Sequence, residues 1–451
     1  MRFTILAVML SVLRNRTYRR LFAAQVIALS GTGLMTVGLA LLAYELAGDR
    51  AGMVLGTALA IKMIAYVGVA PLVGDFTARL PRRAFLVTLD VVRAAVAIAL
   101  PFVDAVWQIY VLIAVLQSAS AAFTPTFQAT IPDILVKEDD YTRALSLSRL
   151  AYDLENLLSP TLAAILIGLV GFHWLFGGTV IGFLVSAALI LSVTLPAPAA
   201  NAATDGGAPR TGKGIRIYLA TPRLRGLLAV NLAVAAAGAM VIVNTVVLVR
   251  GILGRGEADV AVALAAFGGG SMAAALFLPR LLDRIGDRAV MLPAAGTMAV
   301  LPVMLSMTTA VAADALWLLL LAVWFLIGAC YSAAQVPTGR LLRRSAHAVD
   351  RPTVFAAQFA LSHACWLLTY PLAGWLGGIA GMPVTLLVLG IVALVGAGLA
   401  YALWPAGDPE VLSHEHPDLN DDHPHLAAGR NAHRHDYVID HLHRRWPATA
   451  R

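Results

Sequence analysis

The sequence predicts an all-α membrane protein with twelve transmembrane helices in two halves of six. The first observation is composition: 59% of the 451 residues are hydrophobic and 13% are charged, a balance far outside the range of soluble proteins. The second is the length of the apolar segments, which reach about 20 residues and can cross a hydrocarbon core of about 30 Å. The third is a polar stretch rich in Pro, Ala and Gly that divides these segments into two groups of six.

The chain divides into five regions. Residues 1–20 form a lead-in, 21–195 the first half, 196–225 a linker, 226–404 the second half and 405–451 a polar tail. Each apolar segment is expected to be a helix, because lipid offers no partners to open backbone groups. In the first half we expect helices at 21–44, 52–73, 84–103, 105–127, 146–169 and 174–195. In the second half we expect them at 226–249, 258–278, 289–311, 315–337, 353–378 and 384–404.

Basic residues predict the orientation. The lead-in, the linker and the loops after the second, eighth and tenth helices are rich in arginine, whereas the opposite loops hold only Arg50, Arg250 and Arg255. The positive-inside rule then places both termini and the tail in the cytoplasm of a multi-pass inner-membrane protein. The pI of about 9.6 reflects these loops, so we expect no nucleic-acid partner.

An internal repeat relates the two halves. The loop "GDFTARLPRR" (Gly74–Arg83) and the loop "PRLLDRIGDR" (Pro279–Arg288) lie 205 residues apart, and at that offset Arg79 matches Arg284. Two six-helix halves related as parallel repeats are typical of secondary transporters, whose cargo site lies near the bilayer midplane between the halves.

The two loops resemble the G-x-x-x-D-R-x-G-R-R loop of the major facilitator superfamily. The second loop has Asp283, Arg284, Gly286 and Arg288 at motif positions. The first has Gly74, Arg79, Arg82 and Arg83, with Ala78 at the aspartate position. The resemblance implies that aspartate and arginine pair across cytoplasmic helix ends and latch one state of an alternating-access cycle. Segments such as "FTPTFQATIPDILVKEDDYTRALSLSR" are similar to the exporter branch that includes macrolide and enterobactin efflux proteins.

Ionisable residues inside the predicted helices are the candidates for coupling. A charge at membrane depth costs about 2.5–3.5 kcal/mol on insertion scales, so its presence indicates a function or a buried partner. Lys62 lies in the middle of the second predicted helix, with Glu45, Asp153 and Glu155 as alternative counter-charges. We expect these three carboxylates to bind protons or cations and Lys62 to compensate their charge.

Three further polar residues lie within the predicted helices. Asp90 and Arg93 are three residues apart on one helical face, close to the cytoplasmic end, and we expect a structural ion pair there. His363 is a lone histidine in an apolar helix. It is either a hydrogen-bonded packing residue or a ligand.

The polar tail repeats His-x-His four times. The pairs are His414 with His416, His423 with His425, His433 with His435, and His441 with His443. We expect the empty tail to be disordered, because no run in it is apolar enough to form a core. Two such pairs supply four imidazoles, which suit Ni²⁺, Co²⁺, Zn²⁺ or Cu²⁺. A His-rich cytoplasmic tail on this fold is similar to that of nickel-resistance exporters.

These observations predict a secondary transporter rather than an enzyme. We expect a monomer that exports a divalent transition metal such as nickel or cobalt in exchange for protons, with no required cofactor. Two alternatives stay open: a multidrug or siderophore exporter, and a membrane metal sensor that keeps the fold without transporting. No G-x-x-x-x-G-K-[ST] sequence indicates coupling to ATP.

Overall fold

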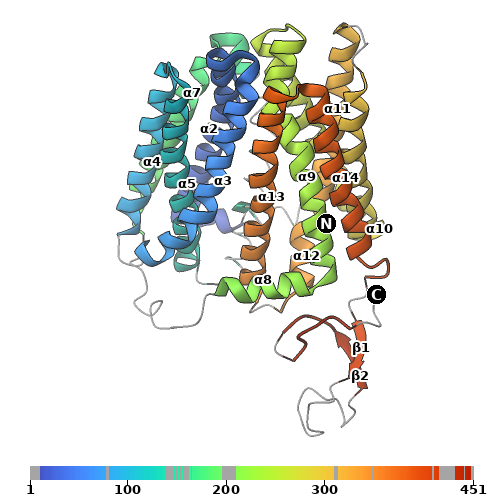
Figure 1. Ribbon diagram of the computed structural model, residues 1–451. Coiled ribbons are helices and arrows are strands. Elements are labelled where there is room, and N and C mark those ends of the chain that lie inside the picture. The colour runs from blue at the N-terminus through green and yellow to red at the C-terminus, as the bar shows by residue number, and fades with distance from the viewer. Residues whose placement is uncertain are drawn as a thin grey trace.

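The computed structural model describes residues 11–77, 81–135, 162–163, 165–195, 210–308, 313–347, 350–408, 411–415, 432–440 and 442–447, with the single positions 137, 140, 144, 147, 148, 151 and 155. These residues form a bundle of long helices and a small hairpin beyond one end of it (Figure 1). The prediction of an all-α membrane fold is confirmed.

The first half consists of helices that run back and forth along the bundle. They are η1 (Ser11–Arg14), α2 (Arg16–Ala47), η2 (Gly48–Arg50), α3 (Ala51–Thr77), α4 (Arg82–Ala99), η3 (Leu100–Phe102), α5 (Val106–Ile134) and α7 (His173–Leu191). They coincide with five of the six segments predicted for this half. Most of the remaining segment, at 146–169, lies outside the described residues.

The second half contains the other six predicted segments. The linker helix α8 (Arg210–Ala220) precedes it, and its own helices are α9 (Pro222–Val246), the π-helical η5 (Val247–Ile252), α10 (Glu257–Ser306), α11 (Ala313–Gln335), α12 (Thr338–Arg344), α13 (Arg351–Ile379) and α14 (Met382–Leu403). The long α10 combines the predicted eighth and ninth helices, which Gly286 separates with φ 75° and ψ 169°. Only glycine adopts such a conformation without steric cost, which explains the glycine at this motif position.

The linker contains a helix that the sequence reading missed. The amphipathic α8 lies along one end of the bundle (Figure 1), with Ile217 and Tyr218 buried and Arg216 exposed. It is fastened to α13: Lys213 pairs with Asp350, and the Tyr218 hydroxyl donates to Gln358. The composition of this region indicated only a polar linker, because the apolar face of α8 is short.

Nine helical stretches among the described residues are long and apolar enough to cross a membrane, with α2 and α3 taken as one stretch. The 29-residue α13 is not among them. It carries Gln358, Ser362, His363 and Thr369 in its length. A helix with this polarity is better placed between the halves than against lipid.

The two halves meet most tightly between α3 and α13. A β-carbon on Gly56 would fall 2.6 Å from the Tyr370 carbonyl oxygen, and one on Gly374 would overlap the Gly52 carbonyl oxygen. Within the second half, the Asn244 amide of α9 donates to the Ala373 carbonyl at 3.0 Å, and a β-carbon on Gly52 would fall 2.6 Å from the Asn244 side-chain oxygen. We call Gly52, Gly56 and Gly374 the glycine seal; it closes the end of the bundle opposite α8.

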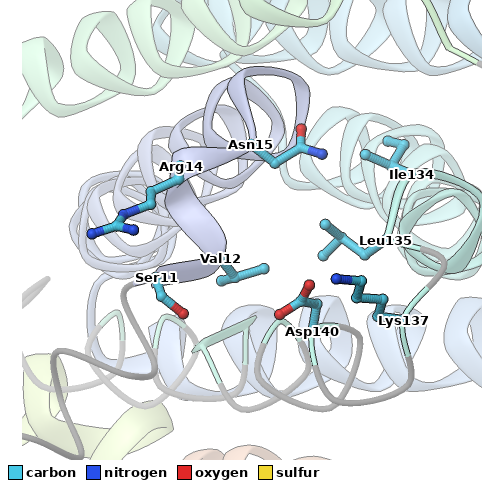
Figure 2. A pocket seen from close by; sticks show the side chains of 8 residues that line it. All are labelled: Ser11, Val12, Arg14, Asn15, Ile134, Leu135, Lys137 and Asp140. Carbon is cyan, nitrogen blue, oxygen red and sulfur yellow. The ribbon is translucent and has the colours of Figure 1, made fainter.

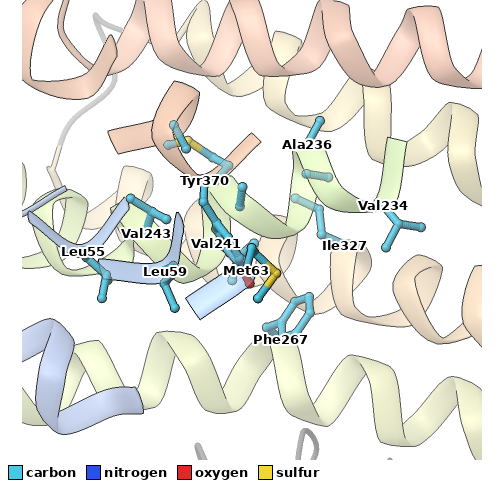
Figure 3. Packing of buried hydrophobic residues seen from close by; sticks show 14 of the residues in the cluster. Leu55, Leu59, Met63, Val234, Ala236, Val241, Val243, Phe267, Ile327 and Tyr370 are labelled. Carbon is cyan, nitrogen blue, oxygen red and sulfur yellow. The ribbon is translucent and has the colours of Figure 1, made fainter. Parts of the chain in front are cut away.

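Apolar packing continues from the glycine seal toward the middle of the bundle. Leu55, Leu59 and Met63 of α3 lie beside Tyr370 of α13 and Val241 of α9 (Figure 3), and all five are buried. This packing joins the two halves, so the bundle is one structural unit at this end.

The tail contains ordered structure where we expected disorder. Strands β1 (Val411–Glu415) and β2 (Ala432–Asp436) pair antiparallel, with His414 opposite His433 and Leu412 opposite His435. Leu412, Tyr437 and Ile439 are buried and join the main apolar core. The expectation failed because these apolar residues are separated in sequence and gather only when the tail docks on the second half.

Candidate functional site

Four residues of α3 and α13 gather near the middle of the bundle. His363 stacks on Tyr66 with ring centroids 5.8 Å apart, and its ring centroid lies 3.9 Å from that of Phe359. The His363 Nδ1–H donates to the Phe359 carbonyl oxygen at 2.7 Å, which leaves Nε2 as the acceptor nitrogen. The Lys62 ammonium lies 6.0 Å from the Tyr66 ring centroid. The two halves therefore contribute a lysine, a histidine and two aromatic rings to one site.

Glu155 lies within electrostatic range of this central site. Lys62 and Glu155 attract one another electrostatically, and the His363 ring lies within electrostatic range of the same ammonium. Glu45, the other counter-charge considered for Lys62, lies at the end of α2, where it is 53% exposed and 3.5 Å from the His173 Nε2. Asp153 lies outside the described residues. Of the counter-charges considered, Glu155 thus lies within electrostatic range of Lys62.

Asp90 and Arg93 form the structural pair that their spacing predicts. Both are buried and paired with each other, and Asp90 also accepts a hydrogen bond from the Ser186 hydroxyl at 2.7 Å. The Arg93 guanidinium lies over the rings of Phe123 at 4.1 Å and Phe183 at 4.5 Å. The pair therefore joins α4 to α5 and α7 within the first half.

The central site lies on the α8 side of the glycine seal. Lys62 and His363 occupy the middle of their helices, whereas Gly52 and Gly374 are near the opposite end. In Figure 1, α3 and α13 diverge below the labels toward the end that carries α8. A site closed at one end, and built from both halves, has the arrangement that alternating access requires.

The arginine-rich loop of the first half is fixed by an ion pair. Arg82, the first residue of α4, pairs with Asp133 near the end of α5, and Arg83 donates to the Leu191 carbonyl. Gly74 lies in the last turns of α3, and Arg79 lies outside the described residues. This loop has Ala78 at the aspartate position of the motif, and among the described residues Asp133 of α5 supplies the carboxylate that pairs with Arg82.

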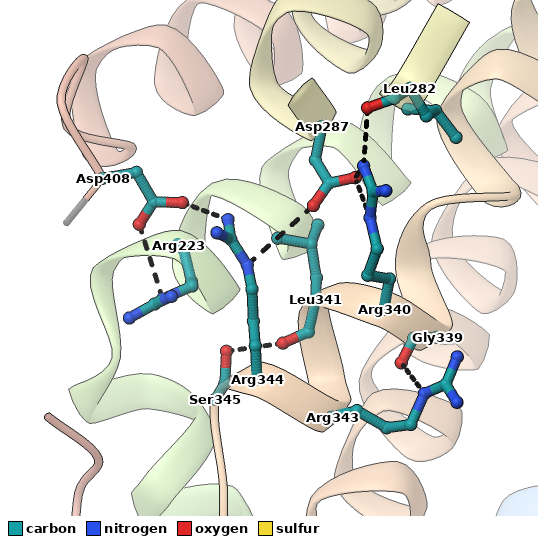
Figure 4. Close-up of polar contacts among 10 residues, drawn as sticks. All are labelled: Arg223, Leu282, Asp287, Gly339, Arg340, Leu341, Arg343, Arg344, Ser345 and Asp408. Atoms are coloured by element: carbon teal, nitrogen blue, oxygen red, sulfur yellow. Dashed lines mark hydrogen bonds and ion pairs between the residues drawn. The ribbon is translucent and has the colours of Figure 1, made fainter. Parts of the chain in front are cut away.

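The equivalent loop of the second half is organised around a residue that the sequence reading missed. Asp287 is 4% exposed; it accepts from the Arg340 Nε at 2.8 Å and lies 3.9 Å from the Arg344 Nε. Arg344 also pairs with Asp408, which lies 3.4 Å from the Arg223 Nε (Figure 4). The sequence feature that could have identified Asp287 is its position 205 residues after Arg82, the spacing that relates the two loops.

The predicted residues of this second loop have different roles. Arg284 is exposed, and the Arg288 Nε donates to the Trp404 carbonyl at 3.1 Å. The side chain of Asp283 lies outside the described residues, so its predicted latch stays a prediction. The ion pair that the structure does describe in this loop is made by Asp287.

The tail docks on the same end of the second half. The Asp440 carboxylate accepts from the backbone N–H groups of Leu442 and His443 and lies 3.3 Å from the His347 Nε2. The Trp446 ring lies 5.1 Å from the guanidinium of Arg223, a buried residue at the start of α9. These contacts hold the segment after β2 against α9 and the loop before α13.

The predicted metal ligands are only partly within the described residues. His435 and His443 are described with their side chains, His414 and His433 by their strand positions, and His416, His423, His425 and His441 lie outside. Among the side chains that the structure describes, no three His, Cys, Asp or Glu residues are gathered closely enough to hold a metal ion.

A separate cavity of about 350 Å³ lies between η1 and the end of α5. Figure 2 shows Arg14 pointing away from the cavity, while the charged ends of Lys137 and Asp140, which both line it, point toward each other. Asn15 caps α2 by accepting from the Tyr18 N–H at 3.1 Å. This cavity belongs to the junction of η1 with α5 and not to the interface of α3 with α13.

Two helical halves, related by an internal repeat and meeting around a central site that contains Lys62 and His363, define a polytopic membrane transport protein. The chain belongs to the Major Facilitator Superfamily, which matches residues 21–252 and 228–438. Members of this family are transporters of small solutes, often with protons.

Solved structures share the fold. A point mutant of the nucleoside transporter NupG is similar with a TM-score of 0.66 and 14% identity, over 86% of this chain and 99% of that one. A D-xylose-proton symporter has a TM-score of 0.62 and 16% identity, over 89% and 98%. A point mutant of the peptide transporter POT has a TM-score of 0.64 and 13% identity, over 86% and 94%. No curated protein matches the chain.

Proposed function

We propose that this chain exports a small organic cation across the inner membrane in exchange for protons, with both termini in the cytoplasm. The observation that carries the proposal is a site built from both halves, in which Lys62 and His363 lie against the ring of Tyr66 and Glu155 is within electrostatic range of Lys62. The arginine-rich loops and α8 support a cytoplasmic position for the open end of the site. The similarity of the first-half segments to efflux proteins supports export.

Glu155 has the properties that exchange requires. A carboxylate with limited access to water binds either a proton or a cationic group and not both, so each ligand displaces the other. When neither a proton nor a cationic cargo is bound, the positive charge of Lys62 compensates the negative charge of the Glu155 carboxylate. The entering proton and the departing cargo therefore compete for binding to Glu155.

The surroundings favour an organic cation over a bare metal ion as cargo. The rings of Tyr66 and Phe359 offer faces that attract a cation and contact its apolar part. The Lys62 ammonium repels a divalent ion twice as strongly as a monovalent one at equal distance.

Export of nickel or cobalt is the second candidate, and the His-x-His pairs of the tail favour it. Imidazole nitrogens bind these ions well, and a tail on the cytoplasmic side would collect them where export begins. A metal sensor without transport would show neither solute-driven nor metal-driven proton flux.

The test uses the purified full-length chain in proteoliposomes that contain a pH-sensitive dye. Lipophilic organic cations, Ni²⁺ and Co²⁺ are added separately, and the proton flux that each one drives is recorded. We expect Glu155→Gln to reduce organic-cation-driven proton flux to the level of empty liposomes, because glutamine binds no proton. The matched control, Glu45→Gln at the exposed end of α2, should retain wild-type flux. Wild-type flux from Glu155→Gln would contradict the proposal, and flux driven only by metal ions would favour the second candidate.

A further inference from the structure

Another cavity lies on the lateral surface of the second half, between α10 and α14. Its volume is about 350 Å³, and it is lined by Arg288, Ala289, Leu292, Pro293 and Tyr401. Ala289 and Pro293 are exposed, and Tyr401 is 69% exposed. Arginine is the one charged residue in this lining, and the other four residues are apolar or aromatic. The cavity therefore suits an apolar molecule that carries an anionic group.

The cavity lies at the edge of a surface that faces lipid. The helical stretches Arg284–Ser306 and Met382–Leu403, which contain its lining, are both long and apolar enough to cross a membrane. Tyr401 is in the last turn of α14, at the end of the bundle that carries α8 (Figure 1). Farther along the two helices, Val300 of α10 and Leu394 of α14 are exposed. The cavity is thus where the lipid-facing surface approaches the membrane interface.

The guanidinium of Arg288 is held at this cavity by two contacts. Its Nε donates to the Trp404 carbonyl at 3.1 Å, and its Cζ lies 5.3 Å from the Tyr401 ring centroid. In the part of the chain that the structure describes, no carboxylate pairs with Arg288, whereas the neighbouring Asp287 is buried and pairs with Arg340. The two terminal nitrogens of Arg288 can therefore donate a pair of parallel hydrogen bonds to a phosphate.

We propose that this cavity is a binding site for one anionic phospholipid. The terminal nitrogens of Arg288 bind the lipid phosphate, and an acyl chain lies against Leu292, Pro293 and Tyr401. Basic residues at the cytoplasmic interface attract anionic lipids, and a pocket between helices makes the attraction specific. A free phosphate has the same charge but nothing to place against the apolar lining, so the geometry favours the lipid.

The site is part of the junction of three helices. Through the Trp404 carbonyl, Arg288 connects α10 to the end of α14. Trp404 is itself buried against α9, where a β-carbon on Gly226 would fall 2.7 Å from the Trp404 Cβ. A bound phosphate fixes the guanidinium that makes this connection, so the lipid is expected to stabilise the junction. The lipid site does not depend on which cargo the central site carries.

The test measures lipid binding to the delipidated full-length protein in detergent by native mass spectrometry. The probes are dioleoyl phosphatidylglycerol, which is anionic, and dioleoyl phosphatidylcholine, which has the same chains and no net charge. We expect the first to bind at least about fivefold more tightly, and Arg288→Gln to remove this preference. The matched control, Arg284→Gln, removes the same charge from an exposed residue that does not line the cavity, and it should keep the preference.

The variant Ala289→Phe provides a second measurement that leaves the charge in place. Its ring fills the cavity from an exposed position, so the protein should fold as the wild type does and should bind phosphatidylglycerol as weakly as Arg288→Gln. Wild-type binding by Ala289→Phe would overturn the proposal, and so would equal losses from Arg288→Gln and Arg284→Gln.

Inorganic phosphate distinguishes a lipid site from a simple anion site. Added at the same concentration as the lipid, it should leave phosphatidylglycerol bound, because it makes no contact with the apolar lining. Displacement of the lipid by phosphate would also overturn the proposal. Proton flux driven by organic cations is measured separately, so failure here leaves the transport proposal intact.

Discussion

The first half places Arg82, at the start of α4, against Asp133 near the end of α5. The second half has Asp287 at the position 205 residues after Arg82, and this residue binds Arg340 of α12. Both pairs join the third helix of a half to the chain at the end of the fourth. Both halves therefore have an ion pair at the same place in the repeat, but the acidic and the basic residue have exchanged positions.

The two ion pairs also differ in their surroundings. Asp133 is 27% exposed, whereas Asp287 is 4% exposed and continues through Arg344 and Asp408 to Arg223. Only this second-half network reaches the tail among the described residues, through Trp446 over Arg223. The motif loops of the two halves thus carry one simple and one extended ion-pair arrangement.

The largest expected effect comes from Asp287→Asn. Asp287 is buried, but Arg340 is 43% exposed and Arg344 keeps its pair with Asp408, so the variant should lose about 1–3 kcal/mol of stability. The loss should appear as a lower unfolding temperature, measured by tryptophan fluorescence, and as reduced proton flux in proteoliposomes.

The matched change in the first half is Asp133→Asn. The Arg82 and Asp133 side chains are 14% and 27% exposed, so this half-buried pair is expected to contribute about 1 kcal/mol, and the variant should lose less stability than Asp287→Asn. Equal losses from the two variants would show that the exposure of the aspartate does not distinguish the halves.

A smaller effect is expected from exchanging the charges of the first half. Arg82→Asp alone places two carboxylates together and should reduce stability and flux. The double variant Arg82→Asp/Asp133→Arg restores an attractive pair with the polarity of the second half, and it should recover most of the loss. Failure of the double variant to recover either quantity would show that Arg82 or Asp133 has a further role that depends on its sign.

The smallest effect concerns the tail docked on the second half. Burial raises the pKa of Asp440, but hydrogen bonds from His443 and Leu442 and the charge of the His443 ring outweigh burial and lower the pKa overall. Its contribution to docking is therefore complete above the ordinary aspartate pKa of about 3.9 and is lost as pH falls through the lowered value.

Fluorescence of Trp446, isolated by replacing the other tryptophans, should consequently report no undocking between pH 7 and pH 5. Asp440→Asn should weaken docking at every pH in that range. A transition within that range in the wild type would contradict this account, because the Asp440 carboxylate does not change its charge there.

Much of the fold followed from the sequence, because apolar length and arginine distribution are properties of each segment alone. Helix α8 and the hairpin did not follow, since their apolar faces are short and are completed only by contact with the second half. Tyr218 reaches Gln358, and Trp446 reaches Arg223, across distances in sequence that no local pattern encodes.

The candidate site was predicted in part for the same reason. Lys62, Glu155 and His363 were recognised because a charge or an imidazole is unusual in an apolar helix. Their association could not be read from spacing, since they belong to three helices, and Glu45 was an equally good partner for Lys62 on sequence alone. Asp287 was missed because it occupies an arginine position of the motif and its partner Arg340 lies outside the loop.

The polarity of α13 has a consequence for how the protein is made. Helix α13 is not among the nine strongly apolar stretches. It is therefore expected to insert weakly into the membrane during synthesis, because its transfer into lipid gains little free energy. Its stable position depends on α3, synthesised some 300 residues earlier, and on α8, which holds its first turns through Lys213 and Asp350. Biogenesis of the second half is therefore expected to require the first half and the linker, and a fragment that begins at α9 should leave α13 poorly inserted.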